Sequence, residues 1–187
     1  MVAGRPAPAA APAGPVTTDD GDPVFTVQRH HASTLHFDLR LEVDGVLVSW
    51  AVPKGPSLDP SVKRLAVKVG DHDLDHATYE GRHAGGRGPG TKIVWDTGTL
   101  TNLTRRDGTE LPLTEAVEAG HLKVELHGHR LNGAFALTRT LLRGDPASWI
   151  LVKVDDHGAD PAHEVTEALT SVLTGRTNTD LEDVEPD

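Results

Sequence analysis

Eight residues of the sequence alternate strictly between apolar and polar side chains: Leu35-His36-Phe37-Asp38-Leu39-Arg40-Leu41-Glu42. Successive side chains of a β-strand point to opposite faces, so the four apolar residues share one face and the four polar residues share the other. Asp44-Gly45 follows, a strong signal for a two-residue hairpin turn, and residues 46–52 form a second apolar run. The stretch therefore predicts the two strands of an antiparallel hairpin.

Similar short segments, rich in β-branched and apolar residues, recur between turn signals on both sides of this hairpin. This pattern is typical of an all-β antiparallel sandwich or barrel. The expected strands are residues 24–28, 35–43, 46–52, 64–69, 92–97, 121–127, 133–140 and 149–154. Two short peripheral helices are also expected, at residues 114–119 and 161–173, and Asp160 can cap the second one with Pro161 at its first position.

The two ends of the chain differ in composition from its middle. Residues 1–23 are rich in Pro, Ala and Gly and are expected to form a disordered tail. Residues 157–187 are expected to hold the second helix and then a frayed acidic tail. A single folded domain is therefore expected at residues 24–156.

The formal net charge of −10 divides unevenly along the chain, into −2 for residues 1–23, +1 for residues 24–154 and −9 for residues 155–187. The expected domain is therefore near neutral, and composition neither supports nor excludes a local basic groove for nucleic acid. The absence of cysteine excludes disulfides and thiolate metal sites. Since the sequence lacks a long apolar run and a signal peptide, we expect a soluble cytoplasmic protein without membrane contact.

The polar face of residues 35–42 has an unusual composition. Four polar residues on one face can simply be the wet side of an edge strand. However, His36 and Asp38 point the same way and could ligate one divalent ion, with a third ligand from His30 or His31. Arg40 lies one step further along the same face, where its guanidinium could grip a phosphate oxygen.

Other residues could complete such a site. Glu42 could orient a histidine or Arg40. His72 and His76 follow a strand and could serve as general acid or stabilise charge on phosphorus, or they could belong to a solvated acidic turn. Lys54 and Arg64 are candidate phosphate contacts, although single exposed cations usually serve solubility.

Several runs of sequence carry a resemblance to a known family. They are Val27-Gln28-Arg29-His30, the alternating stretch 35–42, Gly45-Val46-Leu47-Val48-Ser49-Trp50-Ala51-Val52-Pro53-Lys54-Gly55-Pro56-Ser57, Lys63-Arg64-Leu65-Ala66-Val67, Asp71-His72, Tyr79-Glu80-Gly81 and Gly90-Thr91. Over about residues 24–155 the chain resembles the 3′-phosphoesterase domain of bacterial DNA ligase D. The resemblance implies a single closed antiparallel β-barrel of about eight strands, whose polar interior holds a manganese-type site.

The resemblance also implies an activity. Members of the family trim 3′ ends of primer strands in DNA repair by end joining: they remove a terminal ribonucleoside and then the 3′-phosphate, leaving a 3′-hydroxyl. The implied substrates are DNA or RNA-tipped DNA 3′ ends, and the implied partners are an end-joining ligase, a polymerase and Ku. We expect a nucleoid-associated monomer. Because no ligase or polymerase sequence accompanies the domain, we also expect a stand-alone form.

Carried over by position, the resemblance assigns a role to most of these candidate residues. It implies metal ligands at His30, His36 and Asp38, phosphate contacts at Arg40, Lys54 and Arg64, and a catalytic histidine at His72. We add His76 to the catalytic residues with His72 and Arg40, and Glu42 to the substrate-binding residues. The implied ion is Mn²⁺, with Zn²⁺ or Co²⁺ as alternatives.

The chain departs from the family at three places. His76 stands where the family usually has Tyr, and Arg82-His83-Ala84-Gly85-Gly86 replaces an Ile-Pro-Glu-Gly stretch. Residues 81–90 then form a basic glycine-rich loop, which is weak evidence for contact with a nucleic-acid backbone. The Pro/Ala-rich start lacks the Arg and Glu that help the family's diesterase step, so removal of a phosphate monoester is better supported.

Two rival functions remain open at this point. A non-haem iron oxygenase also uses a His-x-Asp pair with a distant His on a β-barrel, but the neighbouring cations favour a phosphate substrate. The second rival is a non-catalytic module that binds DNA ends, which the departures at His76 and in the loop make conceivable.

Overall fold

The computed structural model describes residues 21–84 and 90–187. The expected disordered tail lies outside the described residues except for positions 21–23, and so does the centre of the basic loop, positions 85–89. None of the helices in the described part of the chain has the length and apolar character needed to cross a membrane.

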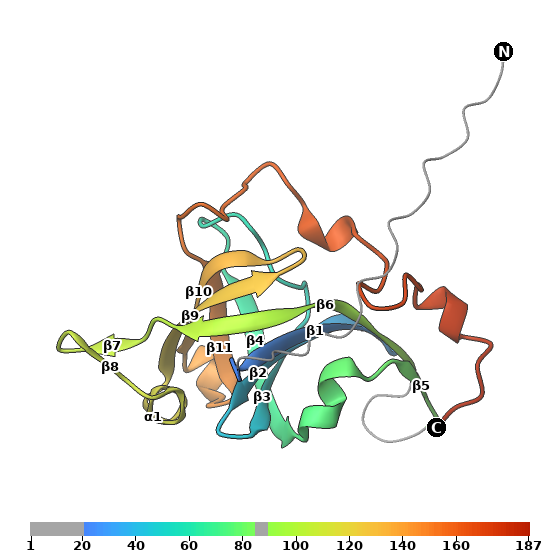
Figure 1. Cartoon of the computed structure of the whole chain (residues 1–187), viewed down its shortest axis with the longest axis horizontal. Helices are drawn as coiled ribbons and strands as arrows, with labels where there is room; N and C mark the ends of the chain where they lie inside the picture. Colours follow the sequence, from blue (N-terminus) through green and yellow to red (C-terminus); the bar gives the residue numbers. More distant parts are fainter. Residues whose placement is uncertain (1–20, 85–89) are drawn as a thin grey trace, which may run out of the picture.

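The described residues form a mostly β structure with one short α-helix (Figure 1). The strands are β1 (Val24–His31), β2 (Leu35–Val43), β3 (Val46–Val52), β4 (Arg64–His72), β5 (Gly81–His83), β6 (Gly90–Asn102), β7 (Arg105–Arg106), β8 (Thr109–Glu110), β9 (His121–Gly128), β10 (Asn132–Arg139) and β11 (Ser148–Lys153). The helix is α1 (Leu113–Ala119), and the 3₁₀ turns are η1 (Leu74–Thr78), η2 (Leu142–Gly144), η3 (Val165–Glu167) and η4 (Thr179–Leu181). All eight expected strands and the first expected helix are confirmed, with boundaries that differ by a few residues.

Eight strands close into an antiparallel barrel, in the order β1-β2-β3-β4-β11-β10-β9-β6, with β6 pairing back to β1. The predicted hairpin joins β2 to β3 through Asp44 and Gly45, whose positive φ angles of 49° and 79° fit the two-residue turn. The expected fold class is therefore confirmed.

The interior of the barrel is apolar. Phe37 of β2, Leu126 of β9, Phe135 of β10 and Leu151 of β11 come from different parts of the ring and line one small cavity. They belong to a single cluster of buried apolar side chains that includes residues from all eight barrel strands. The polar interior that the family resemblance implied is therefore wrong: the polar residues of β2 point away from this core.

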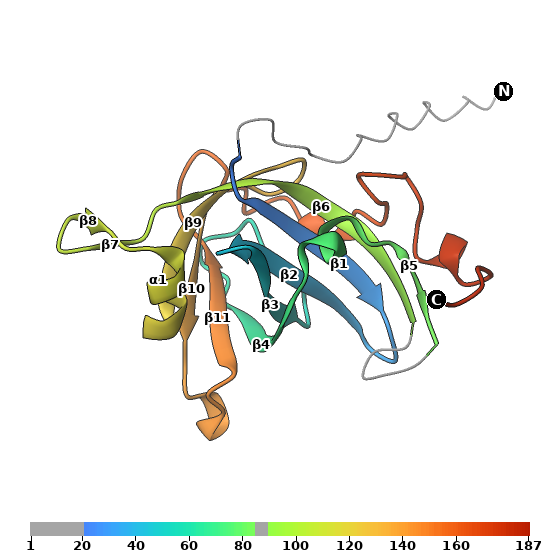
Figure 2. The ribbon, with the colours of Figure 1, turned by 60° about the horizontal axis from the view of Figure 1, so that its bottom comes forward.

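Much of the outer face of β1, β2 and β3 is also buried, and η1 packs against β1 and β3 there (Figure 2). Gln28 of β1 fixes this cover, since its Nε2 donates to the main-chain oxygens of His76 at 3.0 Å and of Tyr79 at 2.9 Å. The polar face of β2 is therefore buried at Asp38 and Arg40 and stays partly exposed at His36.

The predicted helix at residues 161–173 is wrong, because only the turn η3 forms there. The backbone of this segment bonds to the barrel instead: the main-chain N of Val172 donates to the Val94 oxygen, and Trp95 Nε1 donates to the Ala168 oxygen. The Ser171 hydroxyl accepts the N–H groups of residues 173 and 174. These tertiary and side-chain bonds replace the bonds of a helix.

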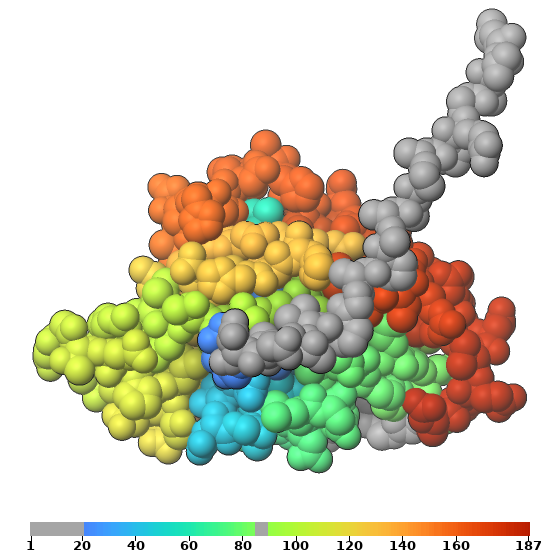
Figure 3. Space-filling view, viewed as in Figure 1, coloured from blue at the N-terminus to red at the C-terminus, as the bar shows by residue number. Residues whose placement is uncertain are grey.

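The last residues of the sequence are not frayed, contrary to expectation. The red C-terminal segment lies against the barrel in Figure 3. Asn178 is buried, and its Nδ2 donates to the main-chain oxygens of Arg29 and Thr91. The main-chain N of Asp187 donates to the oxygen of Arg82 in β5. These bonds outweigh the local preference of an acidic segment for solvent.

Candidate metal centre

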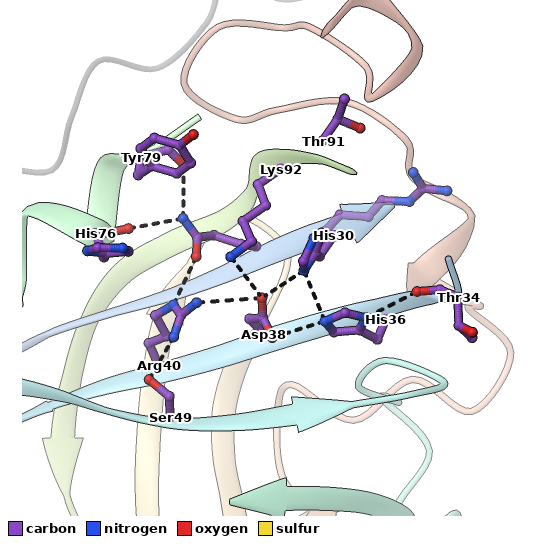
Figure 4. A network of polar contacts seen from close by, with 12 residues as sticks. His30, Thr34, His36, Asp38, Arg40, Ser49, His76, Tyr79, Thr91 and Lys92 are labelled. Atoms are coloured by element: carbon purple, nitrogen blue, oxygen red, sulfur yellow. Dashed lines mark hydrogen bonds and ion pairs between the residues drawn. The ribbon is translucent and has the colours of Figure 1, made fainter. Parts of the chain in front are cut away.

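His30, His36 and Asp38 meet on the outer face of the β1–β2 hairpin (Figure 4). The antiparallel register sets His30 opposite His36 and Gln28 opposite Asp38, so the three side chains project from the same face. His30 Nδ1 lies 3.1 Å from His36 Nε2 and 3.6 Å from Asp38 Oδ2, and His36 Nε2 lies 3.3 Å from Asp38 Oδ1. The strand pairing therefore selects His30, and not His31, as the partner of His36.

This geometry fits a divalent ion. An ion held about 2.0–2.2 Å from each nitrogen or oxygen ligand places neighbouring ligand atoms roughly 3–3.5 Å apart. The three side chains hold donor atoms at about this spacing, with His30 facing one oxygen of Asp38 and His36 facing the other. In addition, His36 Nδ1 lies 3.2 Å from the main-chain oxygen of Thr34. A hydrogen bond to this oxygen keeps a ring hydrogen on Nδ1, so Nε2, which faces Asp38, can give up its own hydrogen and offer its lone pair when an ion binds.

Asp38 stays ionised despite its burial. Burial alone raises the pKa of this carboxyl, but hydrogen bonds from His30 and His36 and the charge of Arg40 outweigh it and hold the pKa well below its usual value. The hydrogen bond with Asp38 in turn raises the pKa of His36. The centre therefore offers one anionic oxygen and two imidazole nitrogens, the ligand set expected for Mn²⁺, Zn²⁺ or a similar ion.

Arg40 lies beneath this centre, with only 1% of its surface exposed. Its Nε donates to Gln28 Oε1 at 2.9 Å and its Nη1 to Ser49 Oγ at 2.9 Å. Its Nη2 lies 3.5 Å from Asp38 Oδ2. All three nitrogens of the predicted phosphate contact are thus engaged within the protein, and the guanidinium orients its neighbours.

His72 is the next residue along this network, because its Nδ1 lies 2.9 Å from Arg40 Nη1. A guanidinium can only donate, so His72 Nδ1 accepts and the ring carries its hydrogen on Nε2. Burial and the charge of Arg40 lower the pKa of His72, which favours this neutral form. The His76 ring packs against the His72 ring with a centroid distance of 4.9 Å. His72 is therefore a hydrogen-bond donor through Nε2.

The remaining predicted residues lie apart from the three candidate ligands. Glu42 Oε2 accepts the main-chain N–H of Val24, so it supports the start of β1. Lys54 and Arg64 line a separate pocket of about 260 Å³, together with Lys63. Arg64 also pairs with Glu164, at 3.9 Å between Nη2 and Oε2, and the phosphate contacts of Lys54 and Arg64 stay predictions.

The sequence analysis did not identify one residue that lies at this centre. Lys92 of β6 pairs in register with His30, and its Nζ lies 3.9 Å from Asp38 Oδ2. The sequence predicted Lys92 only as the start of a strand. The pairing of β6 with β1 closes the barrel, and no local pattern in the sequence reveals that register.

Comparisons with known proteins agree with this architecture. The model of the DNA ligase D 3′-phosphoesterase domain matches residues 28–139. The chain is 49% identical over 157 residues to the multifunctional non-homologous end joining protein LigD of Pseudomonas aeruginosa, which covers 82% of this chain and 18% of that protein. It is 43% identical over 137 residues to the multifunctional non-homologous end joining DNA repair protein LigD of Mycobacterium tuberculosis, covering 73% of this chain and 16% of the relative.

The fold and the site together define a small β-barrel domain with a candidate His-His-Asp metal centre on the outer face of its wall. The matches are more specific: the chain belongs to the DNA ligase D 3′-phosphoesterase domain family. The family resemblance drawn from the sequence is thereby confirmed. The chain spans less than a fifth of the length of these curated relatives.

Proposed function

We propose that the chain is a metal-dependent 3′-phosphoesterase that heals DNA or RNA 3′ ends in end-joining repair. The observation that carries the proposal is the convergence of His30, His36 and Asp38, each of which offers one donor atom within 4.8 Å of the other two, beside the buried cation Arg40. A cationic centre of this kind suits a phosphate substrate. Family membership supports the same reaction.

In this proposal His30, His36 and Asp38 hold one divalent ion, and the proposed ion is Mn²⁺. When bound, such an ion neutralises charge on the phosphate oxygens and supplies an activated water. Arg40 keeps Asp38 ionised and fixes the tautomer of His72. His72 donates from Nε2 to an oxygen of the phosphate as negative charge develops there. His76 packs against His72 and shares in positioning it.

The pocket of Lys54 and Arg64 is proposed to contact the substrate strand. Cations that neutralise backbone phosphates position a nucleic acid without reading its sequence. The predicted substrate contact of Glu42 stays a prediction. We propose 3′-phosphorylated DNA and RNA-tipped DNA as substrates, with an end-joining ligase, a polymerase and Ku as partners. Removal of a terminal ribonucleoside is a further, separate proposal.

The test is release of phosphate from a 3′-phosphorylated oligonucleotide in the presence of Mn²⁺. His36→Ala is expected to abolish release, while His31→Ala, which changes the exposed neighbouring histidine, is expected to leave it intact. Full activity of His36→Ala would overturn the proposal. Turnover that requires 2-oxoglutarate and oxygen would favour an oxygenase, and tight binding of 3′-phosphate ends without turnover would favour an end-binding module.

A further inference from the structure

Lys92 brings a second cation to the candidate metal centre. Its side chain extends from β6 across β1 toward Asp38 of β2, and Figure 4 shows it pointing at the carboxylate. The 3.9 Å separation between Nζ and Asp38 Oδ2 is an ion pair, but it is too long for a hydrogen bond. Within the part of the chain that the structure describes, no hydrogen bond from this ammonium is found.

The contrast with Arg40 is informative. Arg40 is almost fully buried, and its Nε and Nη1 already donate to Gln28 and Ser49. The Lys92 side chain keeps 12% of its surface exposed. An ammonium carries three donors, and a partly exposed ammonium with unused donors can bind an incoming anion.

The charged groups around Lys92 leave a local excess of positive charge that can attract such an anion. Burial lowers the pKa of Lys92, and Asp38 and Arg40 are the charged groups that act on it. Asp38 is thus the one acid among the described groups that perturb Lys92, and it faces two cations before any metal is bound. A divalent ion would add further positive charge, which a phosphate monoester, mostly a dianion at neutral pH, can balance.

We propose that Lys92 is a substrate-contacting residue of this centre, whose ammonium donates a hydrogen bond to a non-bridging oxygen of the 3′-terminal phosphate. This inference rests on the proposed function, since it names a phosphate contact for that reaction. It adds a residue from β6 to a site whose other members come from β1, β2 and the end of β4. In this arrangement Arg40 pairs with Asp38 and donates a hydrogen bond to His72, and Lys92 binds the substrate.

The test compares Lys92→Met, Lys92→Arg and, as a matched control, Lys68→Met. Lys68 lines a groove beside α1 and pairs with Asp71, so its removal changes net charge equally without touching the centre. For Lys92→Met we expect kcat/KM on a 3′-phosphorylated oligonucleotide to fall about 10- to 100-fold, the usual effect of losing a charged hydrogen bond. Lys92→Arg is expected to recover most of this loss, and Lys68→Met to match the wild type.

Mn²⁺ affinity, measured by calorimetry on each variant, separates a substrate contact from support of the metal ligands. Unchanged or tighter Mn²⁺ binding by Lys92→Met is expected, because the substitution removes a cation beside Asp38. Wild-type kcat/KM in Lys92→Met would overturn the inference. Loss of Mn²⁺ binding in parallel with activity would overturn it as well.

A failure of the proposed function is recognised separately. If the wild-type protein releases no phosphate under Mn²⁺, the proposed function fails, and binding can then be measured without turnover. In that case the inference is supported if the wild type binds a 3′-phosphorylated oligonucleotide more tightly than its 3′-hydroxyl counterpart and Lys92→Met does not. Equal preference in both proteins would overturn it.

Discussion

Two buried aspartates of this protein have different surroundings. Asp96 of β6 is fully buried and accepts the main-chain N–H groups of residues 129, 130 and 131, at 2.9, 3.2 and 2.8 Å. Asp38 of β2 is 6% exposed, and its partners are the side chains of His30, His36 and Arg40, with Lys92 nearby. Burial is therefore common to both residues, and the kind of partner distinguishes them.

The pKa values of the two carboxyls shift in opposite directions. Burial raises the pKa of Asp96, whereas imidazole hydrogen bonds and the charge of Arg40 lower the pKa of Asp38 against the effect of burial. Backbone donors are fixed in a turn and cannot be exchanged without unfolding it. Side-chain donors can rotate and give way to an ion. We infer from this comparison that Asp96 stabilises the fold, while Asp38 is placed to act as a ligand in the candidate metal centre.

The largest expected effect is on activity at Asp38. Asp38→Asn removes the anionic ligand but keeps the shape of the side chain. We expect phosphate release from a 3′-phosphorylated oligonucleotide to fall at least about 1000-fold, as for the loss of a main catalytic group. Retained turnover in Asp38→Asn, measured under saturating Mn²⁺, would break the distinction between the two aspartates.

A smaller loss of activity is expected at His72. His72→Ala removes the Nε2 donor, and loss of one such donor lowers kcat by about 100- to 1000-fold. Mn²⁺ affinity should stay close to that of the wild type, because His72 bonds to Arg40 and not to the candidate ligands. The exposed His127, which bonds to Thr101, provides the control His127→Ala. If His72→Ala lost Mn²⁺ binding, its assigned role would be wrong.

At Asp96 the expected effect is on stability. In Asp96→Asn an amide NH₂ faces main-chain donors that lose their acceptor, at a cost of about 2–4 kcal/mol in the free energy of unfolding. Urea unfolding measures this change. Activity per folded molecule should be preserved. A variant of normal stability with impaired catalysis would reverse the roles given to the two aspartates.

The smallest effect is expected on the pH dependence of stability at a third aspartate, Asp156. Its carboxylate has both a side-chain partner and main-chain partners. Burial alone raises the pKa of Asp156, but Lys153 and the main-chain N–H groups of Ala134 and Gly158 lower it to about 2. Because this folded-state pKa lies below the ordinary value of 3.8, the carboxylate stabilises the fold above about pH 4 and loses this contribution as the pH falls toward 2.

Asp156→Asn should therefore flatten the acid limb of a plot of unfolding free energy against pH, relative to the wild type. Asp155→Asn, at the exposed neighbouring position, is the matched control and should follow the wild-type curve. Identical slopes for all three proteins would show that the Asp156 carboxylate does not support the fold.

Much of the site could be predicted from one strand. The alternation of residues 35–42 placed His36, Asp38 and Arg40 on a common face, and Asp44-Gly45 predicted the hairpin. Local periodicity determines which side chains share a face, because it depends only on strand geometry. It could not choose between His30 and His31, since that choice depends on the register between β1 and β2.

Features that depend on distant contacts could not be predicted in this way. Alternation does not tell which face of a closed barrel lies inside when both faces are largely buried, so it gave no check on the polar interior that the family resemblance implied. Lys92 reaches the centre only through closure of the barrel between β6 and β1. The helix expected at residues 161–173 followed from local propensity, and bonds to β6 replaced it.

The central claim is that His30, His36 and Asp38 together hold one divalent ion. Calorimetric titration of Mn²⁺ into the wild type, His30→Ala, His36→Ala, Asp38→Ala and the control His31→Ala tests it most directly. The account predicts one ion per chain for the wild type and for His31→Ala, and a loss of affinity of about 100-fold or more in each of the other three variants. Equal Mn²⁺ affinity in all five proteins would contradict it.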